Sequence, residues 1–262
     1  MQNRKKDILN LALYAGEIML RSGGETYRVE ETMLRLCGAC GIPRVETFVT
    51  PTGIFLSIDD EGNDNATFTF QKRIRSREID LSKVSRVNDF SRAFSPEKMS
   101  MTEGMALLKQ IDGPPRYPLW MRSLMAGVAA ASFTGMSGGQ SNDMLCSLGI
   151  GVFIYSLLSF HDRLQENTFI KTLLAAAVGS FLALLCGYFR LCTSIDTLII
   201  GAIMILLPGV AITNAIRDSL SADLLSGMVR AFEALITAVS IAVGVGLAIA
   251  FFAFLSGGGI HG

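Results

Sequence analysis

The sequence lacks most of the patterns that identify soluble enzymes and nucleic-acid-binding proteins. Its five cysteines follow no regular spacing, which argues against a disulfide scaffold, and it has only two histidines. Basic and acidic residues number 23 each, so there is no excess of positive charge for nucleic acid. It contains no glycine-rich phosphate loop, G-x-S-x-G or H-E-x-x-H motif. The sequence therefore predicts no metal, no cofactor and no nucleic-acid partner.

Charge is also scarce in the second half of the chain. Residues 119–262 hold only six of the 23 basic and seven of the 23 acidic residues, although half of all residues are hydrophobic. The contrast predicts two domains, an α/β cytoplasmic domain at 1–115 and a transmembrane domain at 116–262. We expect the fold class to be an α+β cytoplasmic domain followed by an all-α membrane domain.

Uncharged segments in the second half are long enough to cross a bilayer as helices. A membrane-spanning helix needs about 20 apolar residues, and charges are expected at its ends. Five segments meet these conditions: 122–143, 143–162, 171–190, 196–217 and 234–255. The sequence therefore predicts five transmembrane helices in the lipid bilayer.

The positive charges between these segments predict the orientation of the chain. Lysine and arginine lie mostly in the connections at 116–122, 163–171 and 217–230, whereas Arg190 is alone on the opposite side. Because short cytoplasmic loops carry more positive charge, we expect the N-terminus in the cytoplasm and the C-terminus outside. The expected location is the plasma (inner) membrane.

Small residues recur every four positions in three of the segments. Such rows let helix backbones approach closely, either within one chain or between chains. The sequence leaves both possibilities open. The rows are Ser123, Gly127, Ala131 and Gly135; Ala175, Gly179, Ala183 and Gly187; and Ala234, Ala238, Ala242, Gly246 and Ala250.

The first 115 residues combine helical and strand patterns. Apolar residues at helical spacing occupy 8–22, and Ser22 with Glu25 has the spacing of a capping box that would begin a second helix. Strand patterns follow at 44–50, 53–59 and 66–72. Further helices are expected near 80–93 and 101–111, the latter begun by a capping box of Ser100 and Glu103.

Two short motifs in this domain have functional and structural interpretations. Cys37 and Cys40 form a C-x-x-C pair that could bind zinc or do redox chemistry, but its position at a helix end favours simple packing. The stretch "GETYRVEE" gathers charged residues where carboxylates would stabilise a helix start, which is a sufficient structural reason for them. Its candidate residues are Glu25, Thr26, Arg28 and Glu30.

The stretch "ILLPGVAITNAIRD" interrupts an apolar segment near its end. Pro208 and Gly209 should break the helix, and broken backbone at membrane depth must be buried by protein or reached by water. Substrates of transporters often bind at such breaks. Four polar residues follow the break and could bind a carboxylate-bearing ligand: Thr213, Asn214, Arg217 and Asp218. Alternatively, the helix simply ends at the membrane surface and Arg217–Asp218 is a solvated pair.

Both motifs resemble those of the threonine/serine exporter family. The first match comprises Gly24, Glu25, Thr26, Arg28, Val29 and Glu30, and the second is P-G-x-x-x-T-N-x-x-R-D from Pro208, followed by Gly227. The resemblance implies a cytoplasmic domain and five spans, as in half-length members that are paired with a smaller all-membrane subunit. It also implies export of small amino acids, or of dicarboxylates such as succinate.

Three kinds of function remain open at this point. The first is a subunit of a secondary exporter for small carboxylate-bearing metabolites, which is not an enzyme and works with a second membrane subunit or with further copies of itself. The second is a membrane-tethered, hydrolase-like enzyme that uses Glu25, Arg28 and Glu30. The third is a channel or scaffold. The resemblance favours the exporter.

Overall fold

The computed structural model describes residues 2–42, 44–60, 66–75, 78–114, 117–161 and 168–256. The chain divides into two compact units, and each combines two separate segments. Unit 1 comprises Met1–Pro114 and Gly209–Phe232, and unit 2 comprises Pro115–Pro208 and Glu233–Gly262.

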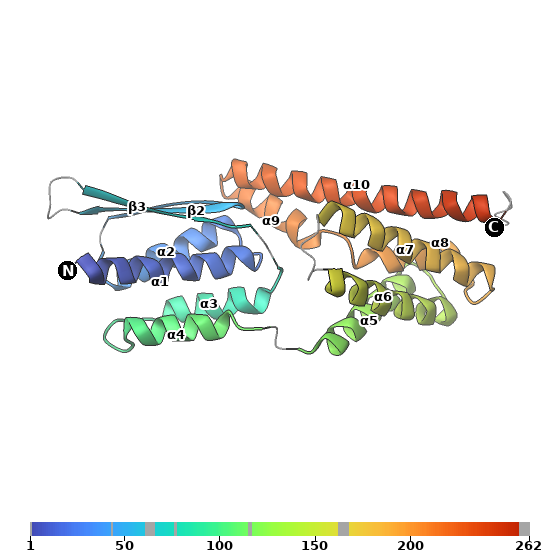
Figure 1. Ribbon diagram of the computed structural model, residues 1–262, viewed down its shortest axis with the longest axis horizontal. Coiled ribbons are helices and arrows are strands. Elements are labelled where there is room, and N and C mark those ends of the chain that lie inside the picture. Colours follow the sequence, from blue (N-terminus) through green and yellow to red (C-terminus); the bar gives the residue numbers. More distant parts are fainter. Residues whose placement is uncertain are drawn as a thin grey trace. The chain divides into compact units, whose positions relative to one another are not determined.

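Among its described residues, unit 1 contains three strands and six helices, the last of which it shares with unit 2. Figure 1 shows α1 between the sheet and the α3–α4 pair. The elements are α1 (Gln2–Arg21), α2 (Thr26–Ala39), β1 (Val45–Thr50), β2 (Gly53–Asp60), β3 (Ala66–Arg73), α3 (Leu81–Ala93), α4 (Met101–Ile111), α9 (Gly209–Leu220) and the first turns of α10 (Leu224–Leu255).

The sheet of unit 1 is an antiparallel meander in the order β1-β2-β3. Thr50 pairs with Gly53 across a two-residue turn, which sets the register of the first hairpin. Alternate residues of β2, including Ile54, Leu56 and Ile58, are buried in the core that α1 and α2 also form. The predicted strands and helices of this segment are confirmed within one or two residues, apart from the starts of α1, which lies six residues earlier than predicted, and of α2.

Unit 2 is a group of helices that approach one another at small residues. It contains α5 (Leu119–Met136), α6 (Ser141–His161), α7 (Thr168–Tyr188), α8 (Ile195–Met204) and the rest of α10. A Cβ atom on Gly127 of α5 would lie 2.6 Å from the Leu148 carbonyl oxygen of α6. Likewise, a Cβ atom on Gly244 would lie 2.4 Å from the Leu173 carbonyl oxygen of α7. These contacts leave no room for a larger side chain.

The predicted rows of small residues differ in what they contact. Ala175 and Ala183 of the α7 row are buried, and a Cβ atom on Gly179 would lie 2.5 Å from the side chain of Ile154 on α6. By contrast, the α10 row is exposed from residue 238 onward, and no described atom lies within 4 Å of a Cβ atom placed on Gly246. Most of the α10 row is therefore not used for packing among the described residues.

The predicted fold class is wrong in two respects. Among the described residues, three helices are long and apolar enough to cross a membrane: α7, α10 and the Ser141–Ser159 part of α6. A fourth span exists only if α8 and α9 together form one interrupted crossing. Moreover, the N-terminal 114 residues do not form a separate cytoplasmic domain, because Gly209–Phe232 belong to the same compact unit. The predicted division at residue 115 itself stays a prediction.

The five-span prediction failed because it counted missing charges rather than hydropathy. The uncharged segment 122–143 includes a turn at 137–140, and α5 carries Arg122 and several serine and threonine residues. In the fourth segment, α8 ends at Met204 after ten residues, and α9 begins at Gly209. Of the predicted connection at 163–171, residues 163–167 lie outside the described residues, as do residues 257–262.

Candidate functional site

The two sequence motifs meet inside unit 1, at the turn between α1 and α2. This α1–α2 turn comprises residues 22–25, and Gly23 has a φ of +92°, which glycine adopts without strain. The Asn214 side chain of α9 donates a hydrogen bond to the Gly23 carbonyl oxygen at 2.8 Å. Arg230 of α10 donates to the Gly24 carbonyl oxygen, also at 2.8 Å. Two residues that follow this turn by 191 and 206 positions in the sequence therefore hold it.

Glu25 is the central carboxylate of the site. Its side chain is 6% exposed, and its Oε1 atom accepts a hydrogen bond from Arg217 at 2.5 Å. Its Oε2 atom accepts one from Arg28 at 3.3 Å. Burial raises the pKa of Glu25, but hydrogen bonds from Arg217 and from the Glu25 backbone, with the charges of Arg28 and Arg217, more than offset this, so the pKa lies below its ordinary value. Glu25 is therefore an ionised carboxylate held between two arginines.

Asp218 is fully buried and links α9 to both α2 and α10. Its Oδ1 atom accepts a hydrogen bond from the Thr26 backbone N–H at 3.2 Å, and its Oδ2 atom lies 2.8 Å from Arg230 Nε. Thr26 begins α2, so Asp218 satisfies one of the free N–H groups at that helix start. The predicted capping box of Ser22 and Glu25 is wrong, because Glu25 makes no side-chain cap and contacts arginines instead.

Asp223 and Glu30 complete the polar cluster. Asp223 accepts a hydrogen bond from the Thr26 hydroxyl at 2.8 Å and one from the Ser226 backbone N–H at 3.2 Å, near the start of α10. Glu30 accepts one from the Val49 backbone N–H at 2.9 Å, which ties α2 to β1. Burial and the nearby charge of Asp223 raise the pKa of Glu30. We call Glu25, Arg28, Glu30, Arg217, Asp218, Asp223 and Arg230 the charged cluster.

The predicted substrate residues lie on two faces of α9. Thr213 and Arg217 are exposed, one helical turn apart, and the Thr213 hydroxyl donates to the Gly209 carbonyl oxygen at 2.9 Å. Asn214 and Asp218 are buried and face the α1–α2 turn. The pair that the sequence suggested between Arg217 and Asp218 is replaced by two others, Arg217 with Glu25 and Asp218 with Arg230. Pro208 lies between α8 and α9.

Sequence reasoning did not identify Asp223 and Arg230 as site residues. In the sequence, Arg230 was used only to predict the orientation of the chain. It is, however, the one arginine of α10, a nearly uncharged helix, and it is buried. A useful signal was available, because a charge within an apolar helix normally faces a partner. The residue that would pair with it could not be read from the sequence.

Two other candidate sites offer weaker chemistry. Cys37 lies in the hydrophobic core and burial raises its pKa to about 12, so its thiol is unreactive. Among the residues that the structure describes, no three metal-ligating side chains gather at one point. The burial of Cys37 in the core agrees with a packing role for the C-x-x-C pair.

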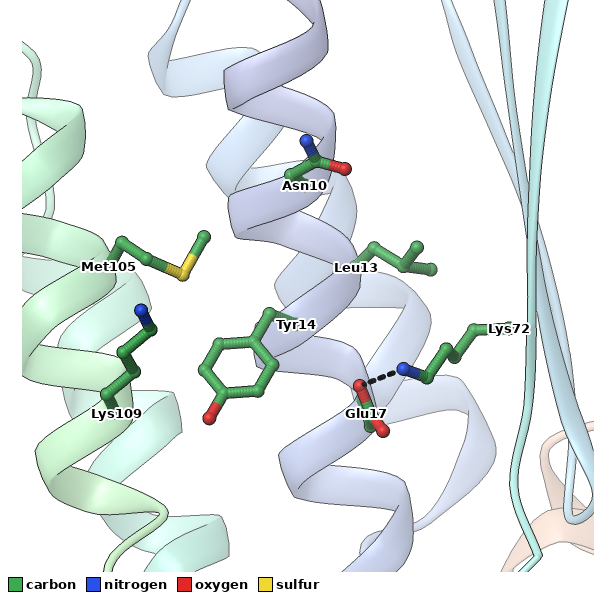
Figure 2. Close-up of a pocket in the computed structure, with 7 residues that line it drawn as sticks. All are labelled: Asn10, Leu13, Tyr14, Glu17, Lys72, Met105 and Lys109. Carbon is green, nitrogen blue, oxygen red and sulfur yellow. Dashed lines mark ion pairs between the residues drawn. The ribbon is translucent and has the colours of Figure 1, made fainter.

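A pocket of about 340 Å³ opens on another face of unit 1 (Figure 2). It is lined by Asn10, Leu13, Tyr14, Glu17, Lys72, Met105 and Lys109. Lys72 is paired with Glu17 at 3.0 Å, and the Tyr14 hydroxyl donates to Asp112 at 2.9 Å. Burial and the bond to Asp112 raise the pKa of Tyr14 to about 12. None of these lining residues belongs to either sequence motif, whereas the charged cluster joins the two motifs, so the charged cluster is the better candidate site.

The chain is similar over most of its length to membrane transport proteins. It matches the family model described as "Putative threonine/serine exporter" over residues 10–252. It is 24% identical to the "Probable succinate transporter subunit YjjP" of Escherichia coli over 250 residues, which cover 94% of this chain and 95% of that protein. The protein of the same name from Klebsiella aerogenes is 23% identical with the same coverage.

A fungal relative is longer. The "Pheromone-regulated membrane protein 10" of Eremothecium gossypii is 26% identical over 250 residues, which cover 85% of this chain and 33% of the fungal protein. No solved structure matches the chain. Because the family model covers nearly the whole sequence and several helices can span a membrane, this chain is a multi-pass membrane protein that belongs to the threonine/serine exporter family.

Proposed function

We propose that this protein is a subunit of a secondary exporter for small carboxylate-bearing metabolites, either amino acids of the threonine and serine type or dicarboxylates such as succinate. Arg217 binds the substrate carboxylate, and Thr213 contributes a hydroxyl on the same exposed face of α9. Asn214 and Asp218 hold the α1–α2 turn in place behind it. Support comes from the family and from the names of the bacterial relatives, since both kinds of substrate carry a carboxylate.

The observation that carries this proposal is the unequal exposure of the Arg217–Glu25 pair. The Arg217 side chain is 55% exposed, whereas its carboxylate partner is 6% exposed. A substrate that arrives from solvent therefore reaches the guanidinium first. Glu25 already occupies the position that a substrate carboxylate would take, so binding becomes an exchange of one carboxylate for another. An arginine can bind a carboxylate with two parallel hydrogen bonds, which makes such an exchange specific.

The same pair accommodates an amino acid as well as a dicarboxylate. A zwitterion offers a carboxylate to Arg217 and an ammonium group to the Glu25 carboxylate that the exchange releases. The resting arrangement offers an arginine to an anion, and Glu25 is not free to act as a general base until a substrate displaces it. In the resting state both Glu25 oxygens accept hydrogen bonds from arginine.

We also propose that the chain acts together with a second membrane subunit or a second copy of itself. The YjjP relatives are named as subunits. The exposed α10 row of Ala238, Ala242, Gly246 and Ala250 offers a face on which another helix could pack closely. Ala242→Cys, on the exposed row, should form a cross-link to that partner. Ala248→Cys, at a buried position of the same helix, should not.

The test of the proposed function is transport by the purified full chain, together with any subunit that accompanies it, in liposomes loaded with succinate or threonine. Arg217→Lys should reduce export about tenfold, because a lysine offers only a point charge. The matched control is Arg28→Lys, which alters the other partner of Glu25 and should have a smaller effect. Export by Arg217→Lys at the parental rate would refute the assignment of Arg217.

The orientation of the chain can be tested separately. We propose that unit 1 faces the cytoplasm, where an exporter loads, and that α10 carries the chain across the plasma membrane to an outside C-terminus. Ser256 lies just after α10, so Ser256→Cys should react with an impermeant maleimide added outside intact cells. Cysteine at the exposed Ala106 of unit 1 should react only after the cells are permeabilised. Labelling in the reverse order would contradict this orientation.

A further inference from the structure

We propose that a dicarboxylate substrate brings one proton onto Glu25 when it binds to Arg217, so that proton and dicarboxylate move together. This inference rests on the proposed function, since it requires the substrate to displace Glu25 from Arg217. Its basis is the charge balance of the cluster and the burial of Glu25.

The charged cluster has fewer positive than negative groups. Its three guanidinium groups come from α2, α9 and α10, and they are Arg28, Arg217 and Arg230. Its four carboxyl groups are Glu25 of the α1–α2 turn, Glu30 of α2, Asp218 of α9 and Asp223 of the turn before α10. Tyr27 is the other titratable group near Arg217, and a tyrosine side chain cannot supply a positive charge to the cluster. A substrate carboxylate would be a fifth negative group among three positive ones.

Glu25 is the carboxyl group that loses most when such a substrate binds. Asp218 keeps Arg230 at 2.8 Å, Asp223 keeps the Thr26 hydroxyl, and Glu30 keeps the Val49 N–H. Glu25 alone gives up its shortest contact, the one to Arg217, and retains the longer contact to Arg28. Its side chain remains buried, so the ionised form loses support while the cost of burying a charge stays.

The proton balance of the step is simple. One proton from the cytoplasmic solvent forms an O–H bond on the freed Glu25 carboxylate, and no covalent bond breaks. The neutral carboxyl can then donate a hydrogen bond to the bound dicarboxylate. When the substrate leaves, Arg217 returns to Glu25, which releases the proton. A dicarboxylate that moves outward would therefore take a proton with it.

The pKa of Glu25 supports the direction of this change. In the resting state burial raises it, and the bond from Arg217 together with the charge of Arg28 lowers it below the ordinary value. When Arg217 moves to the substrate, Glu25 loses the contribution that lowers its pKa most, so the pKa of Glu25 rises. Substrate affinity should therefore increase as pH falls, at any pH above the lowered resting value and below the raised value of the bound state.

The decisive experiment is calorimetry of succinate binding to the full chain, in two buffers that differ in their enthalpy of ionisation. The difference between the two heats gives the number of protons taken up. About one proton per succinate is expected for the wild type. Glu25→Gln should still bind succinate but take up no proton. Glu31→Gln, which removes an exposed carboxyl group of α2 that pairs with Arg35 outside the charged cluster, should behave like the wild type.

The outcomes separate this inference from the proposed function. Succinate binding without proton uptake by the wild type, or unchanged proton uptake by Glu25→Gln, would overturn the inference. Unchanged succinate binding by Arg217→Lys would instead overturn the proposed function. Threonine carries its own ammonium group and should bind without proton uptake; uptake with threonine would contradict the charge-balance argument.

A second measurement keeps the inference testable if Glu25→Gln does not fold. The wild-type affinity for succinate should rise by about tenfold for each unit that the pH falls within the stated window. An affinity that does not change with pH in this range would overturn the inference.

Discussion

Unit 1 and unit 2 each bury one aspartate completely, but they neutralise it by different means. Asp218 of unit 1 lies 2.8 Å from Arg230, a cation whose side chain is only 5% exposed. Asp143 of unit 2 instead accepts hydrogen bonds from three backbone N–H groups, at Gln140, Thr193 and Ser194. Asp218 is thus held by a long side chain as well as by the Thr26 backbone N–H, whereas the three bonds to Asp143 all come from backbone.

This difference indicates in which unit a carboxylate can exchange one hydrogen-bonding partner for another. Backbone N–H groups at a helix start cannot leave their carboxylate without disrupting the helix and its loop. Arginine side chains can move from one carboxylate to another with small changes of rotamer. Unit 1 therefore contains charged groups that can be rearranged by a ligand, whereas unit 2 is held by backbone capping and close contacts at glycine. The predictions below test each half of this contrast.

The largest effect should come from Arg230→Ala in unit 1. The substitution leaves the Asp218 carboxylate fully buried without its cation, and loss of one partner of a buried ion pair costs about 3–5 kcal/mol. The free energy of unfolding in detergent, measured by thermal or denaturant unfolding, checks this.

The matched control is Arg28→Ala, because Arg28 pairs with Glu25 but is 36% exposed. Exposed pairs contribute at most about 1 kcal/mol. The Asp218→Ala/Arg230→Ala double variant should recover part of the lost stability, because it leaves no buried charge. Equal losses for Arg230→Ala and Arg28→Ala would show that burial of the pair is not what matters.

The second effect concerns the close contacts of unit 2. Gly244→Ala places a methyl group 2.4 Å from the Leu173 carbonyl oxygen, which belongs to backbone and cannot rotate away. Overpacking of this kind costs about 1–3 kcal/mol. Gly246→Ala is the matched control two residues along the same helix, where the described residues leave open space. Thermal unfolding should separate the two variants clearly, and similar melting temperatures would contradict the packing seen at Gly244.

Local signals in the sequence predicted local structure well. The Ser100–Glu103 capping box forms as expected, with both of its reciprocal bonds present. The Ser22–Glu25 pair has the same spacing, yet no box forms, because Glu25 contacts Arg217 from 192 residues away. The capping rule considers only neighbours in sequence, so it cannot register a stronger distant partner.

The sequence predicted several residues of the candidate site but not which of them pair with one another. Sequence motifs identified Glu25, Arg28 and Arg217, and the family resemblance joined both motifs to one function. What they could not supply was the pairing, since Asp218 is adjacent to Arg217 in sequence and yet pairs with Arg230. On α9, residues 217 and 218 point about 100° apart, so neighbours in sequence face different partners. Helical geometry therefore separated the pair that adjacency suggested.

The smallest expected effect tests strain at one residue in each unit. Ala222 of unit 1 has a φ of +67° and Arg190 of unit 2 has a φ of +55°, both in the left-handed region that disfavours side chains. Each lies in the turn that directly follows a helix, where glycine is the usual residue. Ala222→Gly and Arg190→Gly should each raise the free energy of unfolding by about 0.5–1 kcal/mol.

The control for this last prediction is Ala106→Gly, the same chemical change at an exposed position within α4, which should lower the free energy of unfolding by about 0.5–1 kcal/mol. Ala222 also precedes Asp223, whose backbone N–H donates to the Asp218 carbonyl oxygen at 2.9 Å. If the turn exists mainly to place Asp223 beside Thr26, Ala222→Gly should stabilise the protein and leave succinate export unchanged. Destabilisation by Ala222→Gly would mean that the alanine side chain contributes packing that exceeds the strain of its backbone.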